Sequence, residues 1–134
     1  MGLLRTIFLL VLAMPLLLSC GSDTTLPPTP VKAPDEPAAL SALREINRAQ
    51  ADFIRRTRRY AQSFDELIAD HLLSAEPTVE GTGYEFRMRP SPDAVSYTVT
   101  ATPNTPESRH FFTDQTGTIY VESGKPATAE SPGI

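Results

Sequence analysis

The sequence predicts an α+β domain, in which an N-terminal amphipathic helix and a short second helix pack on a three- or four-stranded antiparallel meander. Three observations lead to this fold class. Apolar residues recur at helical spacing over residues 40–61, helix-ending residues follow at 77–83, and from residue 84 apolar residues alternate with polar ones. The change of period from 3.6 to 2 indicates helices followed by strands, and short connections favour antiparallel pairing.

The first helix is expected over residues 40–61, where one face collects apolar and small side chains and the opposite face collects arginines and acids. Such segregation is typical of a surface helix that packs on a core. Asp35 is a suitable N-cap, and Asp35 and Glu36 complement the positive end of the helix dipole. The face expected to pack on the core consists of Leu43, Ile46, Gln50, Phe53, Ile54, Thr57 and Ala61.

A second, short helix is expected to begin in the segment "SFDEL". Ser63 and Glu66 stand at the capping-box spacing, ahead of a run of leucine and isoleucine residues. Pro77, Gly81 and Gly83 are then expected to end helical structure.

Strands are expected in the remainder of the domain. Residues 84–89 and 95–102 each alternate apolar with charged or hydroxyl side chains, which predicts strands with one solvated face. Two more strands are expected from Arg109 and from Thr118, joined by a loop in which Gly117 can take a positive φ. The predicted core is Leu43, Ile46, Phe53, Ile54, Leu67, Leu72, Tyr84, Phe86, Tyr97, Val99, Phe111 and Ile119.

The N-terminus has the layout of a secretory signal, expected to occupy residues 1–19. Arg5 precedes an apolar run of about a dozen residues, shorter than the roughly 20 that a membrane-spanning helix needs. The segment "LLSC", which ends at Cys20, resembles a bacterial lipobox, and this resemblance implies cleavage before Cys20 and lipidation of its thiol. The alternatives are an unmodified cysteine beside an ordinary cleavage site and an uncleaved signal anchor.

Cys20 is the only cysteine, so it cannot form a disulfide within the chain. Lipidation of the lipobox kind adds more than one acyl chain, palmitate among them, which is enough for stable anchoring. We therefore expect a cell-envelope lipoprotein that is anchored in the cell membrane or the outer membrane and faces the periplasm or the exterior.

Composition divides the rest of the chain into three parts. Residues 20–37 contain the lipidated cysteine and a segment with five prolines, which predicts an extended stalk. Residues 38–123 are long enough for one small domain, and residues 124–134 are expected to be a flexible tail. The formal net charge of -4 gives no general attraction for nucleic acid, so no nucleic-acid partner is expected.

Several phrases in this domain resemble the globular headpieces of type IV pilins and of the pseudopilins of type II secretion. They are "LREINRAQ" at 43–50, "GYEF" at 83–86, "YTVTATP" at 97–103 and above all "RHFFTDQTGTI" at 109–119. The resemblance covers most of residues 39–121. It implies a helix followed by an antiparallel meander, and an envelope role beside such an apparatus.

The chain departs from that family at its N-terminus. Pilins assemble through an apolar helix that follows a prepilin peptidase site of the type G-F-T-L-x-E. This chain has no such site, and no acidic residue precedes Asp23. The lipobox signal and the proline-rich segment stand where the polymerising helix would be, which argues against the usual filament packing.

No catalytic, cofactor or metal site is expected. His71 and His110 are the only histidines, and neither has a neighbour at ligand spacing. The "DQTG" segment from Asp114 is interpreted as a turn rather than a calcium loop, because it lacks the density of oxygen ligands that calcium needs. With no clustered acid, base or nucleophile, the chain is not expected to be an enzyme.

The arginine-rich segment at residues 55–59 is the one candidate interaction surface. Asp52 can pair with Arg56 at i,i+4, whereas Arg55 and Arg59 are expected to repel one another at the same spacing. Two interpretations remain open, a solvated face and a docking face for an acidic partner or anionic lipid headgroups. The candidate face consists of Arg55, Arg56 and Arg59.

The expected function is therefore a non-enzymatic, membrane-anchored lipoprotein with a pilin-like headpiece and a structural or interaction role, accessory to a type IV pilus or type II secretion system. The alternative is a periplasmic lipoprotein that binds a small ligand or sugar between helix and sheet.

Overall fold

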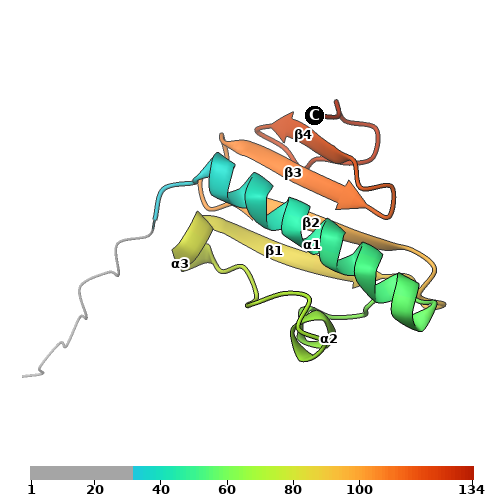
Figure 1. Cartoon of the computed structure of the whole chain (residues 1–134). Helices are drawn as coiled ribbons and strands as arrows, with labels where there is room; N and C mark the ends of the chain where they lie inside the picture. The colour runs from blue at the N-terminus through green and yellow to red at the C-terminus, as the bar shows by residue number, and fades with distance from the viewer. Residues whose placement is uncertain (1–31) are drawn as a thin grey trace, which may run out of the picture.

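The computed structural model describes residues 32–134, which form a helix packed on one face of a four-stranded antiparallel sheet (Figure 1). The fold class is therefore α+β, as predicted. The strands lie in chain order, and each is antiparallel to the next. The elements are α1 (Glu36–Thr57), α2 (Phe64–Ala69), α3 (Val79–Thr82), β1 (Tyr84–Pro90), β2 (Tyr97–Pro103), β3 (Arg109–Asp114) and β4 (Ile119–Ser123).

The expected signal sequence, Cys20 and most of the proline-rich segment lie outside the described residues. Among residues 32–134, no helix is both long and apolar enough to cross a membrane.

Helix α1 begins as predicted but ends earlier than predicted. The side chain of Asp35 accepts a hydrogen bond from the backbone N–H of Ala38 at 3.0 Å, as an N-cap does. The helix ends at Thr57, because Arg58 takes the left-handed conformation (φ 66°) and its N–H bonds to the carbonyl of Ile54. Residues 58–61 therefore leave the helix axis instead of continuing the apolar face.

The core lies between α1 and the sheet. Leu43 and Ile46 from the helix are fully buried, together with Val99 from β2. Two residues of the predicted core are only partly buried: Ile54 lies near the early end of the helix, and Leu72 packs at the edge of the core. Buried residues that the prediction did not include are Ala39, Ala49, Phe64, Leu73 and Ala101, whereas Ala61 is buried as expected but lies beyond the end of α1.

Helix α2 begins at the predicted cap, since Ser63 accepts a hydrogen bond from the N–H of Glu66 at 3.3 Å. The carboxylate of Glu66 reaches back to the N–H of Gln62 at 2.8 Å, one residue before the usual capping-box partner. Of the three residues expected to end helical structure, Gly83 does so, as the left-handed C-cap of α3 (φ 74°). The expectation is wrong for Pro77 and Gly81, because Thr78 caps one further turn, α3, which includes Gly81.

Strand β2 starts two residues later than predicted. Ser91 and Ser96 close the turn between β1 and β2 through a backbone hydrogen bond of 2.9 Å. Ala94 adopts a positive φ of 56° inside this turn, so Val95 lies outside the ladder with 65 % of its surface exposed. Val95 therefore does not alternate with Tyr97 as predicted.

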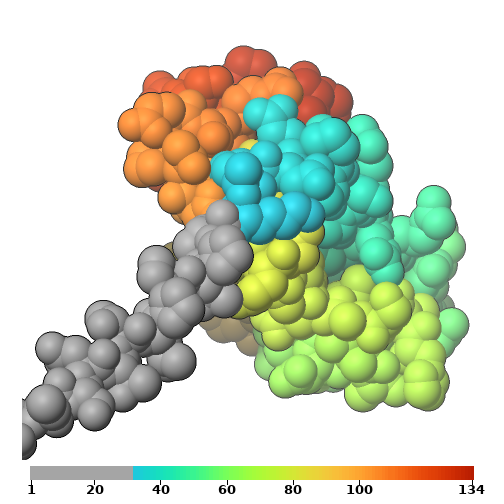
Figure 2. All heavy atoms as spheres, turned by 90° about the vertical axis from the view of Figure 1, so that its left-hand side faces the viewer, coloured from blue at the N-terminus to red at the C-terminus, as the bar shows by residue number. Residues whose placement is uncertain are grey.

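The domain begins before the predicted boundary at residue 38. The N–H of Asp35 donates to the carbonyl of Thr82 at 2.8 Å, and the ammonium of Lys32 donates to the carbonyl of Gly81 at 2.6 Å. Figure 2 shows the first described residues, in blue, lying against the segment around α3, in yellow. At least residues 32–35, which were expected to belong to the stalk, are thus fixed to the domain.

The C-terminal residues, expected to be a flexible tail, fold back onto β4. The N–H of Val121 donates to the carbonyl of Pro132 at 2.8 Å, and the N–H of Ile134 donates to the carbonyl of Ile119 at 2.8 Å. Ala127 is buried, with 5 % of its surface exposed. Loop-like composition did not predict this, because backbone pairing with an edge strand requires little of the side chains.

Candidate functional site

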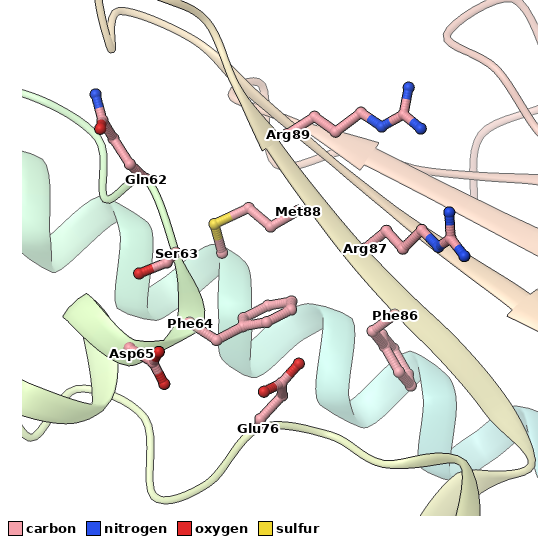
Figure 3. A pocket seen from close by; sticks show the side chains of 9 residues that line it. All are labelled: Gln62, Ser63, Phe64, Asp65, Glu76, Phe86, Arg87, Met88 and Arg89. Atoms are coloured by element: carbon pink, nitrogen blue, oxygen red, sulfur yellow. The ribbon is translucent and has the colours of Figure 1, made fainter.

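A groove of about 420 Å³ opens between the start of α2 and the free edge of β1 (Figure 3). One wall is formed by residues 62–65, and Glu76 contributes to it from the loop that precedes α3. The other wall is formed by residues 86–89 of β1. Since β1 is the first strand in the sheet order, no strand within residues 32–134 neighbours its side away from β2.

The side chains of β1 alternate across this groove. Phe86 and Met88 project toward the helices, while Arg87 and Arg89 project to the opposite side of the sheet (Figure 3). Consecutive residues from both faces of the strand line the groove. The groove therefore follows the edge of β1 rather than one face of the sheet.

The register of β1 and β2 fixes which backbone groups point into the groove. The N–H of Asn104 donates to the carbonyl of Gly83, and the N–H of Ser91 donates to the carbonyl of Ser96. In an antiparallel ladder, hydrogen-bonded pairs recur at every second residue. Glu85, Arg87 and Arg89 consequently bond to β2 opposite Thr102, Thr100 and Thr98, and the residues between them direct their backbone groups outward.

The free edge of β1 is open over a short stretch only. At its start, the hydroxyl of Thr82 accepts from the N–H of Tyr84 at 3.1 Å, and its single proton lies between two acceptors, the carbonyls of Thr78 at 2.9 Å and of Tyr84 at 3.3 Å. At its end, Pro90 has no N–H to offer. Between them, the outward N–H and C=O groups of Phe86 and Met88 have no hydrogen-bond partner among residues 32–134.

An ion pair fixes the α2 wall. Arg59 donates from two guanidinium nitrogens to the carboxylate of Glu66, at 2.9 and 3.0 Å, and its guanidinium carbon lies 5.2 Å from the ring centre of Phe53. The hydrogen bonds from Arg59, followed by that from the N–H of Gln62, hold the pKa of Glu66 below its ordinary value. The pair links the residues after α1 to the first turn of α2.

The three arginines that were predicted to share one helical face therefore do not share it. Arg59 follows the left-handed Arg58 and is engaged by Glu66, so the predicted helical repulsion between Arg55 and Arg59 is wrong. Arg55 pairs with Asp52 at 3.1 Å, and Arg56 is exposed. Of the three candidates, Arg55 and Arg56 stay on α1, whereas Arg59 lies beyond its end and is paired with Glu66, although its side chain is 43 % exposed.

The two histidines are far from equivalent. His71 lies past the end of α2 with a positive φ of 57° and is exposed. His110 is buried in β3, where its Nε2 lies 3.4 Å from the carbonyl oxygen of Pro106. Among residues 32–134, no three potential metal ligands gather in one place.

The segment from Asp114 forms the turn between β3 and β4. Its carboxylate accepts from the N–H of Thr116 at 3.0 Å, and its carbonyl accepts from the N–H of Gly117 at 2.9 Å. Gly117 has the positive φ (78°) that the sequence predicted. The oxygen atoms of Asp114 thus bond within the turn.

Sequence reasoning did not single out the groove. Alternation over residues 84–89 predicted a strand with one solvated face, but it did not show that this strand lies at the edge of the sheet. The available signal was indirect, since a first strand flanked by proline and arginine residues is typical of an edge. Comparison with family models, curated proteins and solved structures gives no match for this chain.

Proposed function

We propose that this chain is a non-enzymatic lipoprotein of the cell envelope, anchored through Cys20, which displays a pilin-like headpiece as an interaction module. Its role is accessory to a type IV pilus or a type II secretion apparatus.

The observation that carries the proposal is that the domain has two separate ends, one where α1 begins and one where it ends. Residues 32–35 are bonded beside α3, so the segment that leads to Cys20 leaves from the pole where α1 begins. Helix α1 has 22 residues, which corresponds to a length of about 33 Å. The exposed Arg56 and Val95 lie toward the opposite pole, because Arg56 is near the end of α1 and the N–H of Tyr60 bonds to the carbonyl of Ala94 at 2.9 Å.

The order of elements supports the pilin-like part of the proposal. An amphipathic helix followed by an antiparallel meander is the order that the resemblance to pilin headpieces implies, and α1 and β1 to β4 follow it. The lipobox signal replaces the apolar helix through which pilins polymerise. We therefore propose a component that contacts such an apparatus from a membrane, rather than a filament subunit of the usual packing.

The alternative, a small ligand bound between helix and sheet, has no comparable support. Leu43, Ile46 and Phe53 of α1 are buried in the same core as Val99 and Phe111 of the sheet. Side chains thus fill the space in which that ligand would lie.

The anchor is tested by labelling cells with palmitate while they express the chain or its Cys20→Ser variant. We expect label in the native chain only, and an uncleaved precursor for the variant, because the lipid is attached through the thiol. Ser22→Ala serves as the matched control and should be labelled like the native chain. Equal labelling of the native chain and Cys20→Ser would refute the lipoprotein.

The partner is tested with a photo-crosslinking residue at Val95, which is exposed at the pole where α1 ends. The same residue at Glu80, which is exposed near the pole where α1 begins, provides the comparison. We expect crosslinks from position 95 to a pilus or secretion component, and fewer from position 80. Crosslinks to transport proteins alone would favour the ligand-binding alternative.

A further inference from the structure

We propose that the open edge of β1 binds an extended peptide segment of a partner protein as an added antiparallel strand. The partner segment carries acidic side chains opposite Arg87 and Arg89, and apolar side chains beside Phe86 and Met88. This inference rests on the proposed interaction role and deepens it by stating the chemistry of the partner.

The backbone provides the hydrogen bonds for such a strand. Phe86 and Met88 each direct one N–H and one C=O away from β2, and none of these groups has a partner among residues 32–134. Residues two apart on one edge match the hydrogen-bonded pairs of an antiparallel strand. Addition of a strand to an exposed edge is a general mode of peptide recognition, in which the backbone gives affinity and alternate side chains give specificity.

The closed ends of the edge limit the length of the added strand. Thr82 already occupies the outward N–H of Tyr84, and Pro90 lacks an N–H. A partner segment can therefore pair fully with Phe86 and Met88 only. About five residues in extended form span this stretch, at roughly 3.4 Å per residue.

Charge determines the preferred sequence of the partner. Side chains opposite one another in an antiparallel pair lie on the same face, with Cβ atoms about 4.5 to 5.5 Å apart. A residue of the added strand opposite Arg87 or Arg89 thus meets a guanidinium group. Arg89 has no ion pair among residues 32–134, and Arg87 is paired only with the exposed Glu85, at 2.8 Å. Acidic side chains at these two positions are favoured.

The other face of the added strand meets apolar side chains of β1. Phe86 and Met88 project toward the helices, and Phe64 of α2 lies across the groove from them, beside the carboxylates of Asp65 and Glu76 (Figure 3). Apolar side chains of the partner that lie opposite Phe86 and Met88 contact these two residues. The partner segment therefore alternates acidic and apolar residues.

A second copy of this chain fits the charges of the edge less completely than an acidic segment. The antiparallel register that uses all four backbone groups pairs Phe86 of each copy with Met88 of the other. That register places Arg89 of each copy opposite Glu85 of the other, but it also places Arg87 opposite Arg87, and like charges in this position are destabilising. An acidic segment places a carboxylate opposite Arg87 as well as opposite Arg89.

The test uses the full chain in detergent micelles and a fluorescent peptide, Gly-Glu-Val-Glu-Val-Lys-Gly, whose two valines would pair with Met88 and Phe86. We expect saturable binding by fluorescence anisotropy that weakens as salt rises, since exposed charge pairs are screened. A peptide methylated on the two valine nitrogens should bind at least tenfold more weakly, because its donors to β1 are lost. Methylation of the two glutamate nitrogens, which point away from β1, should have a smaller effect.

The protein variants test the charges and the edge. The double variant Arg87→Glu with Arg89→Glu should lose at least tenfold in affinity for the acidic peptide, and should prefer Gly-Lys-Val-Lys-Val-Glu-Gly instead. Arg55→Glu with Arg56→Glu, on α1, is the matched control and should bind like the native chain. Met88→Pro removes one outward N–H and should weaken binding, whereas Met88→Leu, which keeps it, should weaken binding less.

Three results would overturn the inference: no binding of the acidic peptide up to about 1 mM, equal binding of the valine-methylated peptide, or no change of preference in the charge-reversed variant. Concentration-dependent dimers in sedimentation that Met88→Pro abolishes would show that a second copy occupies the edge. The assay uses purified components, so its failure leaves the result of palmitate labelling unaffected.

Discussion

The two outer edges of the sheet, β1 and β4, differ in whether the chain itself provides hydrogen-bond partners for their backbone groups. At β4, the C-terminal residues bond to the carbonyl of Ile119 and to the N–H of Val121, and so cover this part of the edge. At β1, the hydroxyl of Thr82 bonds to the N–H of Tyr84, and the outward groups of Phe86 and Met88 have no partner among residues 32–134. An open edge invites pairing with another chain. The difference indicates that β1 is the edge at which a partner strand can bind.

The two edges also differ in charge. Arg87 and Arg89 stand on either side of the open residue Met88, and both are exposed. Charged side chains on an edge strand hinder self-association without removing the backbone donors and acceptors. The β4 edge needs no such charges where the chain's own tail covers it. Selectivity at β1 therefore comes from charge, whereas protection at β4 comes from backbone pairing.

The largest expected loss of stability is that of Gly83→Ala, which disturbs the chain immediately before β1. Gly83 has a φ of 74°, and an added Cβ would lie 2.6 Å from the carbonyl oxygen of Ala33. A left-handed conformation costs a residue other than glycine roughly 1 to 2 kcal/mol, and overpacking roughly 1 to 3 more. We expect a loss of about 3 kcal/mol in denaturant unfolding, with residues 32–35 released.

Gly117→Ala is the matched control for this change. Gly117 has nearly the same φ, 78°, but an added Cβ would meet no atom within 4 Å. A loss of only about 1 kcal/mol is expected there, from backbone conformation alone. Equal losses at the two glycines would show that residues 32–35 do not pack against Gly83.

Deletion of residues 125–134 would open the β4 edge and remove its difference from β1. The deletion removes two backbone hydrogen bonds and the burial of Ala127. At roughly 0.5 to 1.5 kcal/mol for each hydrogen bond, we expect a loss of about 2 kcal/mol. The shortened chain should also self-associate in sedimentation experiments, because β4 then presents unpaired groups.

Ile134→Ala controls for the deletion, since it keeps the backbone bond to Ile119 while shortening a side chain that is 59 % exposed. Its stability should lie within about 0.5 kcal/mol of the native value. A deletion variant that is as stable and monomeric as this control would show that the tail does not protect the edge.

The smallest effect is expected at the α2 wall of the β1 groove, and it depends on pH. The pKa of Glu66 is held below its ordinary value of 4.5, chiefly by the hydrogen bonds from Arg59. Because the folded pKa is lowered, the carboxylate stabilises the fold at neutral pH, and this contribution disappears as pH falls from about 4.5 through the folded value. Between pH 7 and pH 3, the melting temperature of Glu66→Gln should therefore fall by less than that of the native chain.

Glu80→Gln is the control for this experiment, because Glu80 is exposed on α3 and makes no ion pair with residues 32–134. It should retain the acid sensitivity of the native chain. A Glu66→Gln variant with unchanged acid sensitivity would show that the pair with Arg59 does not hold α2 in place.

Local sequence patterns predicted where α1 and α2 begin, but they did not predict where α1 ends. Asp35 and Ser63 mark the starts of α1 and α2, because a side-chain acceptor at an N-cap acts on backbone groups only three residues away. The end of α1 was missed, because Arg58 takes a left-handed conformation that its residue type does not favour. A contact beyond the helix end fixes this turn, since the Gln50 side chain holds Ala61 through hydrogen bonds of 2.9 and 3.1 Å.

The candidate surface was harder to predict than the fold. The sequence placed Arg55, Arg56 and Arg59 on one helical face, because periodicity assumes that the helix continues. The turn at Arg58 brings Arg59 to Glu66, seven residues further along the chain. Pairing over such a loop depends on how the chain reverses, which local pattern does not contain.

By itself, the sequence determined the class of the domain, the order of α1, α2 and the strands, and most of the residues that α1 and the sheet turn toward one another. These properties follow from periodicity and from caps, which act over a few residues. Only the tertiary structure decided which strand edge stays open. That outcome depends on distant contacts: Thr82 against Tyr84, the tail against β4, and the absence of a strand beside Phe86 and Met88 within residues 32–134. Backbone groups are the same in every residue except proline, so only their partners in the folded chain distinguish a closed edge from an open one.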